Sequence, residues 1–272
     1  MTRIAVLQMT SGIDPAANAA TLVRAIADAA AGGAAMLFTP EMSGMIDRNR
    51  ERAEGKIVGE ADNPVLAAVC GAAAHAGLWV ALGSLAIRRE DGRLANRSLV
   101  IDGGGNVVAR YDKIHMFDVA LASGESWRES AAYAPGEEVV TVATPAGKLG
   151  LTVCYDIRFP ALFEELGRRS CDVIAIPAAF TVPTGKAHWH VLQRARAIEA
   201  SAYVVAAAQV GEHEDGRQTY GHSLVVDPWG EVLLDMGGET PGLAFAELDP
   251  ARTAEVRAQL PSLANKRAIP RS

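Results

Sequence analysis

Residues 149–160 read LGLTVCYDIRFP, and this stretch indicates an α/β fold more clearly than any other part of the chain. A short apolar run leads into Cys154, and a polar turn and a proline that favours the first turn of a helix follow it. We therefore expect the thiol at the carboxyl end of a strand. Ligands of open α/β sheets gather there, and the dipole of a helix start favours a thiolate. The alternative is a buried, inert cysteine.

Two further segments combine a buried strand with a charged residue at its end. Glu41 closely follows residues 35–39 (AMLFT), and Lys113 closely follows residues 106–111 (NVVARY). If the three strands share a sheet, Glu41, Lys113 and Cys154 converge on one pocket. A carboxylate there can accept the thiol proton, and a desolvated lysine can stabilise the oxyanion of a tetrahedral intermediate. Taken singly, each charge is more typical of a solvated surface.

The rest of the chain alternates strands and helices. Asp14 and Asn63 each precede a proline, a pairing typical of a helix start, and the glycines at Gly32 and Gly77 predict where these helices end. Further strands are expected at residues 4–9, 78–85, 98–102, 139–143, 171–177, 203–209, 222–227 and 231–234. Hairpins mixed with strand–helix units indicate a single α/β domain over residues 1–272.

Composition excludes several classes of function. With 272 residues, 49% hydrophobic and 21% charged, the chain can bury one large core. A net charge of −6 provides no electrostatic surface for nucleic acid. No apolar run approaches the ~18 residues that span a bilayer, and the sequence opens directly with a strand. We expect a soluble protein with no membrane partner.

The chain has three cysteines, Cys70, Cys154 and Cys171, without the C-x-x-C spacing of a zinc site. This argues against a disulfide framework and suits a reducing, cytoplasmic compartment. Cys70 and Cys171 are expected to be inert packing residues.

The three charged and thiol segments resemble the Glu-Lys-Cys triad of the nitrilase superfamily, the carbon–nitrogen hydrolases. The residues concerned are Glu41 in FTPE, Lys113 in YDKIH and Cys154 in VCYD, and the resemblance covers nearly the whole chain. A further family carboxylate, which orients the lysine and substrate, resembles Glu129. The resemblance implies a four-layer αββα sandwich and a homodimer, with the helix near residues 188–201 as a candidate contact. It implies a small-molecule amide substrate and no metal or organic cofactor.

The resemblance also implies a reaction. Glu41 accepts the proton of Cys154 as the sulfur attacks an amide carbonyl. Lys113 and the backbone N–H of Tyr155 hold the oxyanion, ammonia or an amine leaves, and water hydrolyses the thioester.

The residues around the thiol favour one branch of the superfamily. Cys154 is followed by Tyr155 and Asp156, whereas nitrilases tend to have Cys-Trp-Glu. This resembles the amidase branch that includes ω-amidases and deaminated-glutathione amidases, and residues 195–209 and 220–223 resemble the latter more closely. Residues 185–189 (GKAHW) also resemble this amidase branch, but Lys186 stands where both groups usually have proline. We expect hydrolysis of a carboxylate-bearing amide such as deaminated glutathione.

Several alternatives remain open. An ω-amidase acting on α-ketoglutaramate, a nitrilase and an N-carbamoyl amide hydrolase share the chemistry. A non-enzymatic protein that uses Cys154 as a redox-responsive thiol is disfavoured, because a degenerate relative would be expected to have lost Glu41, Lys113, Glu129 or Cys154.

Other polar residues have two interpretations each. Arg158 either binds a substrate carboxylate with its guanidinium or pairs with Asp156 or Glu164. The residues of the charge run 48–52 are expected to be solvated, although the loops at 43–60 and 117–133 could wall the site. No acidic partner is evident for a metal site at the histidines, which we expect to be structural: His188, His190, His213 and His222.

Overall fold

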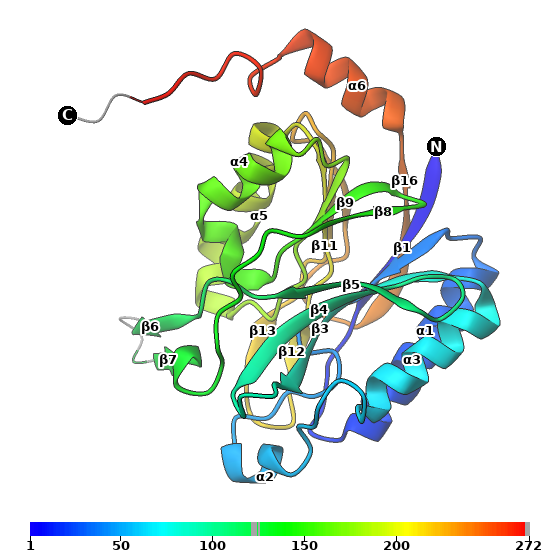
Figure 1. Ribbon diagram of the computed structural model, residues 1–272, viewed down its shortest axis with the longest axis vertical. Coiled ribbons are helices and arrows are strands. Elements are labelled where there is room, and N and C mark those ends of the chain that lie inside the picture. Colours follow the sequence, from blue (N-terminus) through cyan, green and yellow to red (C-terminus); the bar gives the residue numbers. More distant parts are fainter. Residues whose placement is uncertain (121–123, 125, 270–272) are drawn as a thin grey trace.

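The computed structural model describes residues 1–120, 124 and 126–269, and its strands form two six-stranded sheets packed face to face (Figure 1). In the first sheet the order is β16-β1-β2-β3-β4-β5. Strands β1, β2 and β3 are parallel, and the other pairings are antiparallel. The strands are β1 (Thr2–Gln8), β2 (Met36–Phe38), β3 (Trp79–Arg88), β4 (Leu94–Ile101), β5 (Val107–Asp112) and β16 (Gly242–Leu248).

The second sheet has the order β15-β14-β11-β10-β9-β8. Its strands are β8 (Thr141–Thr144), β9 (Gly147–Leu151), β10 (Val173–Ala175), β11 (Tyr203–Ala206), β14 (Leu224–Val226) and β15 (Val232–Asp235). Two small hairpins lie outside the sheets, β6 (Asp118–Ala120) with β7 (Ser126–Arg128) and β12 (Val210–Glu212) with β13 (Gln218–Tyr220).

Helices cover the outer face of each sheet. The first sheet carries α1 (Pro15–Ala31) and α3 (Pro64–Ala76), and the second carries α4 (Pro160–Arg168) and α5 (Val182–Ala200) (Figure 1). The remaining helices are α2 (Arg50–Glu54), α6 (Pro250–Gln259) and the 3₁₀ turns η1 (Glu129–Ala131) and η2 (Cys154–Arg158). This is the expected four-layer αββα arrangement. No helix within the described ranges is long and apolar enough to cross a lipid bilayer.

Side chains alternate between the two faces of each strand and so contribute to two hydrophobic cores, one between the sheets and one between the first sheet and its helices. On β1, Ile4 and Val6 belong to the core between the sheets, while Ala5 and Leu7 pack under α1 and α3. Strands buried on both faces are apolar throughout, which explains why these segments have continuous hydrophobic runs.

The predicted helix starts are confirmed. Asp14 accepts a hydrogen bond from Ala16 N at 2.9 Å at the start of α1, and Asn63 caps α3 through Leu66 N at 3.0 Å. Such caps are worth about 1 kcal/mol each. Gly77 ends α3 in the left-handed conformation, with φ of +64°.

The condition that the three strands before Glu41, Lys113 and Cys154 share one sheet is not met. The strands that precede Glu41 and Lys113, β2 and β5, lie in the first sheet, whereas β9, which precedes Cys154, lies in the second. The residues therefore converge across the sandwich rather than along the edge of one sheet. Periodicity alone cannot assign strands to sheets, because the same apolar pattern fits either one.

Candidate active site

Cys154 occupies a strained backbone position between the sheets. It is the first residue of η2, and its φ of +49° is in the left-handed region that non-glycine residues rarely adopt. Its N–H donates to Pro177 O at 2.9 Å, just beyond β10, which fixes the turn. The side chain is 8% exposed, so the thiol is buried but lines a cavity.

Glu41 lies against this thiol and is held from several sides. The thiol donates a hydrogen bond to the carboxylate. Ala179 N donates to Oε2 at 2.8 Å, and Asn96 Nδ2 and Lys113 Nζ lie 2.9 and 3.2 Å from Oε1. Burial alone would raise the pKa of Glu41, but the charge of Lys113 and these hydrogen bonds outweigh it and lower the pKa.

Lys113 is 2% exposed and lies between two carboxylates. Its Nζ is 2.8 Å from Glu129 Oε2 and 3.2 Å from Glu41 Oε1. Burial opposes its charge, but Glu129 and then Glu41 more than compensate, and the pKa of Lys113 is raised well above its ordinary value. The ammonium is therefore charged and available to an oxyanion.

Asn96 and the backbone at Phe117 position the carboxylate of Glu129. Asn96 Nδ2 also donates to Glu129 Oε1 at 3.1 Å, and Phe117 N donates to Oε2 at 2.6 Å. Asn96 thus joins Glu41 and Glu129, and its backbone O accepts from Lys113 N at 3.0 Å. Sequence reasoning missed Asn96, because nothing in the surrounding residues indicates that this asparagine is buried or that it contacts Glu41 and Glu129.

The protonation state of Cys154 differs from the expectation that a helix start favours a thiolate. Burial, followed by the charge of Glu41, raises the pKa of the Cys154 thiol well above its usual value, despite the helix start. A single 3₁₀ turn has a weak dipole, and the adjacent carboxylate is closer. The resting pair is a neutral thiol beside an ionised carboxylate, which is the state in which Glu41 can accept the proton.

Asp156 joins the segments that carry the thiol and the lysine. This fully buried carboxylate accepts from Tyr111 OH at 2.7 Å and Val153 N at 2.8 Å through Oδ2. His115 N, at 3.1 Å, and His115 Nδ1, at 2.7 Å, contact its Oδ1. His115 and Asp156 each follow a site residue, Lys113 and Cys154, by two positions in the sequence. The contact between His115 and Asp156 was not predicted.

Arg158 lies away from the thiol's cavity. Its guanidinium carbon is 5.3 Å from the Phe180 ring centroid and 5.8 Å from that of Tyr155, and its Nη1 is 3.3 Å from His188 Nδ1. It is not among the described residues that line the cavity, whereas Tyr155 is. Asp156 is committed to other donors, and Glu164 contacts Lys266 instead.

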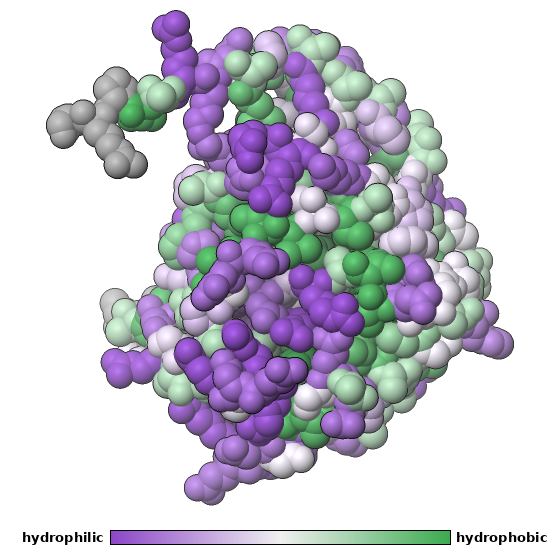
Figure 2. Space-filling model, viewed as in Figure 1, coloured by the Kyte–Doolittle hydropathy of each residue, from purple (hydrophilic) through white to green (hydrophobic). Residues whose placement is uncertain are grey.

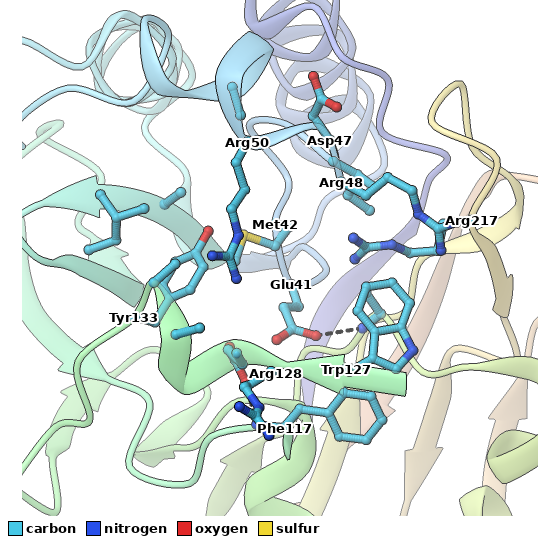
Figure 3. Close-up of a pocket in the computed structure, with 18 of the residues that line it drawn as sticks. Glu41, Met42, Asp47, Arg48, Arg50, Phe117, Trp127, Arg128, Tyr133 and Arg217 are labelled. Carbon is cyan, nitrogen blue, oxygen red and sulfur yellow. Dashed lines mark hydrogen bonds between the residues drawn. The ribbon is translucent and has the colours of Figure 1, made fainter. Parts of the chain in front are cut away.

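A cavity of about 840 Å³ opens onto the thiol, and many of its lining residues come from the loops at 43–60 and 117–133 (Figure 3). This volume is ample for a small-molecule ligand. The site residues Glu41, Lys113, Glu129 and Cys154 all line it. Residues 121–123 and 125 of the second loop lie outside the described residues.

Residues 48–52 are exposed as expected, and two of them also line the cavity. Arg48 and Arg50 line the cavity, as does Arg217, which the sequence did not single out. The loop folds back over the site, partly because Asp47 holds Arg52 on the outside at 2.6 Å. A charge run therefore contributes both to the surface and to the site.

The histidines are also not as isolated as expected. Asp235 bridges His190 Nε2 and His222 Nδ1, each at 2.9 Å, so an acidic partner does complete a group whose ligand atoms lie within 4.8 Å of one another. The sequence did not reveal Asp235 as their partner, because it is 45 positions from His190 and 13 from His222 and only the folding of β15 brings it beside them. His213 is buried and contacts Ser11 O and Thr219 Oγ1, each at 2.8 Å.

Comparisons with known proteins indicate the same chemistry as the geometry of the site. Residues 3–258 match the profile of a family described as Carbon-nitrogen hydrolase. A Synechocystis sp. protein named deaminated glutathione amidase is 47% identical over 179 residues, and the match spans 65% of this chain and 65% of that protein. This is just under two thirds of the relative's length. A protein of the same name from Yersinia enterocolitica is 37% identical, over 98% of this chain and 93% of the relative.

Among solved structures, the C. elegans NitFhit protein superposes with a TM-score of 0.90 at 36% identity. The similarity covers 98% of this chain and 65% of that chain.

Proposed function

Because the chain belongs to the carbon–nitrogen hydrolase family, we propose that it is a cysteine-dependent amidase that hydrolyses a small, carboxylate-bearing amide through a thioester on Cys154. The observation that carries this proposal is the buried contact of a neutral thiol with an ionised carboxylate, beside a lysine charged by two carboxylates. The names of the curated relatives support deaminated glutathione, or a similar α-keto acid amide, as the substrate.

The first step transfers a proton and forms a carbon–sulfur bond. Glu41 takes the thiol proton while the sulfur of Cys154 attacks the amide carbonyl carbon, and the carbonyl electrons move onto oxygen. The Lys113 ammonium and the backbone N–H of Tyr155 stabilise this oxyanion. Glu129 keeps Lys113 charged and in place, since it accepts from Nζ at 2.8 Å.

The second and third steps release the two halves of the substrate. Protonated Glu41 donates its proton to the amide nitrogen as the carbon–nitrogen bond breaks, and the amine departs. The ionised Glu41 then activates a water that attacks the thioester carbon. The tetrahedral species collapses to the carboxylic acid, and the proton returns to the Cys154 sulfur. These residues complete the cycle with acid–base and covalent chemistry.

The other carbon–nitrogen hydrolase activities are outcomes of the test. An ω-amidase would prefer α-ketoglutaramate, a nitrilase would turn over a nitrile, and an N-carbamoyl amide hydrolase would release carbon dioxide with ammonia. A redox-responsive thiol protein would show no turnover at all. The retention of Glu41, Lys113, Glu129 and Cys154 in mutual contact supports an enzyme over this last alternative.

The proposal extends to location and assembly. Three free cysteines, one of them the proposed nucleophile, suit the reducing conditions of the cytoplasm. The family resemblance supports a homodimer. Sedimentation of the purified protein at several concentrations tests the dimer, and a single monomeric species at every concentration would contradict it.

The experiment compares the wild type with Cys154→Ala on four substrates. Deaminated glutathione and α-ketoglutaramate are followed by the release of α-ketoglutarate, and a simple nitrile and an N-carbamoyl amino acid by ammonia. Cys70→Ala, in α3, is the matched control for loss of a thiol away from the cavity. We expect turnover of deaminated glutathione to exceed the others and to vanish only in Cys154→Ala. Turnover that survives in Cys154→Ala would refute the proposed nucleophile.

A further inference from the structure

The cavity wall carries an unusual number of arginines for a chain with a net charge of −6. Besides Arg88, which is 3.6 Å from Glu54, four that line it form no ion pair shorter than 3.7 Å among the described residues: Arg48, Arg50, Arg128 and Arg217. Each carboxylate of the same wall lies near a basic group: Glu41 and Glu129 near Lys113, Asp47 near Arg52 and Glu54 near Arg88. The cavity therefore has an excess of positive charge that the mechanism does not use.

Arg217 is the most enclosed of these four. Its side chain is 19% exposed, and its Nε is buried without a hydrogen-bond partner in the described part of the chain. The nearest acid, Asp215, is 3.7 Å from Nη2 and already accepts from the backbone N–H groups of Arg48 and Arg217. Buried donors in native proteins are almost always paired with protein, water or ligand, so an unpaired one beside a cavity is available to a ligand that enters it.

Arg48 and Arg217 lie together against one aromatic ring. Their guanidinium carbons are 5.3 and 4.5 Å from the ring centroid of Trp127, and Figure 3 shows both on the same side of the cavity as this ring. Stacking engages the flat faces of a guanidinium and leaves the N–H groups at its edge to hydrogen-bond an anion. Asp215 fixes the spacing of the pair by binding both backbones.

The position of the pair relates it to one half of the substrate. Burial lowers the pKa of Arg217 most, and the charges of Asp215 and Glu41 oppose this effect. Arg217 is thus within the electrostatic reach of Glu41, the residue that gives its proton to the departing amine. Glu41, Arg48 and Arg217 line the same cavity, so an amine half that receives its proton from Glu41 can extend toward the two arginines (Figure 3).

We propose that Arg48 and Arg217 form a binding site for a carboxylate at the far end of the departing amine. The preferred substrate class is then an amide of an amino acid or short peptide with a free carboxylate, rather than a primary amide that releases ammonia. Deaminated glutathione, whose amine half is cysteinylglycine, belongs to this class. The inference rests on the proposed amidase function and adds the residues that select the leaving group.

The test uses two substrates that differ only in this carboxylate, deaminated glutathione and its C-terminal carboxamide. The ratio of their kcat/KM values is independent of the fraction of enzyme that is folded, so it is informative even for a poorly stable variant. Wild type is expected to prefer the acid by about 10- to 100-fold, the usual effect of hydrogen bonds to a charged group. The preference should fall toward unity in Arg217→Gln and, independently, in Arg48→Gln, mainly through KM.

A matched variant separates the site from net charge. Arg24 is exposed on α1, where it donates a hydrogen bond to Thr21 Oγ1, and it does not line the cavity among the described residues, so Arg24→Gln should keep the wild-type ratio. An unchanged ratio in both cavity variants would overturn the inference, as would a wild type with no preference for the acid. An equal loss on both substrates would assign Arg217 to the acyl half or to folding and would also overturn it. Absence of Cys154-dependent turnover of any amide would instead refute the proposed function, and this inference with it.

Discussion

Replacing Asp156 by alanine should loosen the active site and destabilise the fold together. The carboxylate is fully buried and has four donors: Tyr111 OH at 2.7 Å, Val153 N at 2.8 Å, and N and Nδ1 of His115 at 3.1 and 2.7 Å. The variant leaves these donors without an acceptor in a space that water does not readily fill. Removing one partner from such a buried charged network costs about 3–5 kcal/mol.

This loss should be visible in two measurements. For a protein of this size, 1 kcal/mol corresponds to roughly 2–4 °C in Tm, so a fall on the order of 10 °C is expected in a thermal melt. Asp156 also ties the turn that presents Cys154 to the segment that presents Lys113. A displacement of about 1 Å between the two should lower kcat on the order of 100-fold.

Tyr111→Phe is the matched control for this prediction. It keeps the ring in place and removes only one of the donors, so about 1 kcal/mol and a Tm loss of a few degrees are expected. Both variants should be compared at the same pH by calorimetry and by initial rates. If Asp156→Ala melts within 2 °C of wild type, the network does not hold the two segments together and the reasoning is wrong.

The remaining predictions concern the proton, the oxyanion and the backbone. The lowered pKa of Glu41 places the acid limb of kcat/KM below pH 4.5, so the rate should be lost as pH falls through that lowered value; a limb near pH 6 would contradict it. The raised pKa of the Cys154 thiol should suppress alkylation by iodoacetamide at pH 8.5, where an ordinary thiol is half ionised; fast labelling there would count against the neutral thiol. Lys113→Met should lower kcat by about 10²–10³-fold, while a Tm measurement distinguishes this from unfolding. Gly83→Ala should destabilise the protein by about 1–3 kcal/mol in urea unfolding, because the new Cβ would lie 2.1 Å from Thr39 O, next to the segment that carries Glu41; a neutral result would show that β3 can shift.

Stability should follow pH with two opposite signs. The lowered pKa of Glu41 contributes stability above its unfolded pKa, and this contribution is lost as pH falls through the folded value. The raised pKa of Lys113 contributes stability below its ordinary value of 10.5, and this is lost only as pH rises through the higher folded value.

Local signals in the sequence were sufficient for most elements of the two sheets, but β16 and α6 were not predicted. Asp14 and Asn63 begin helices because their side chains accept backbone N–H groups within three residues, an interaction that needs no distant partner. The turn from β4 into β5 at residues 103–105 is local as well, because Gly105 adopts a φ of +81° and Asp102 Oδ1 accepts from Gly104 N at 2.8 Å. The family resemblance then supplied the layers and the four central site residues, whose contacts the structure shows.

Local signals could not supply the partners of those residues. Whether Arg48 faces solvent or a cavity depends on Trp127 and Asp215, which are 79 and 167 positions away in the sequence. The same holds for Asn96, which joins Glu41 to Glu129, and for Asp235, which joins two histidines.

The sequence by itself therefore determined most of the strands and helices and the residues that can perform the chemistry. Only the tertiary structure decided that Glu41 and Lys113 reach Cys154 from the opposite sheet, that the thiol is neutral at rest, and that Arg217 is enclosed. The physical reason is range. Capping and side-chain periodicity act over a few residues, whereas burial and electrostatic interaction depend on distances in space that chain packing sets.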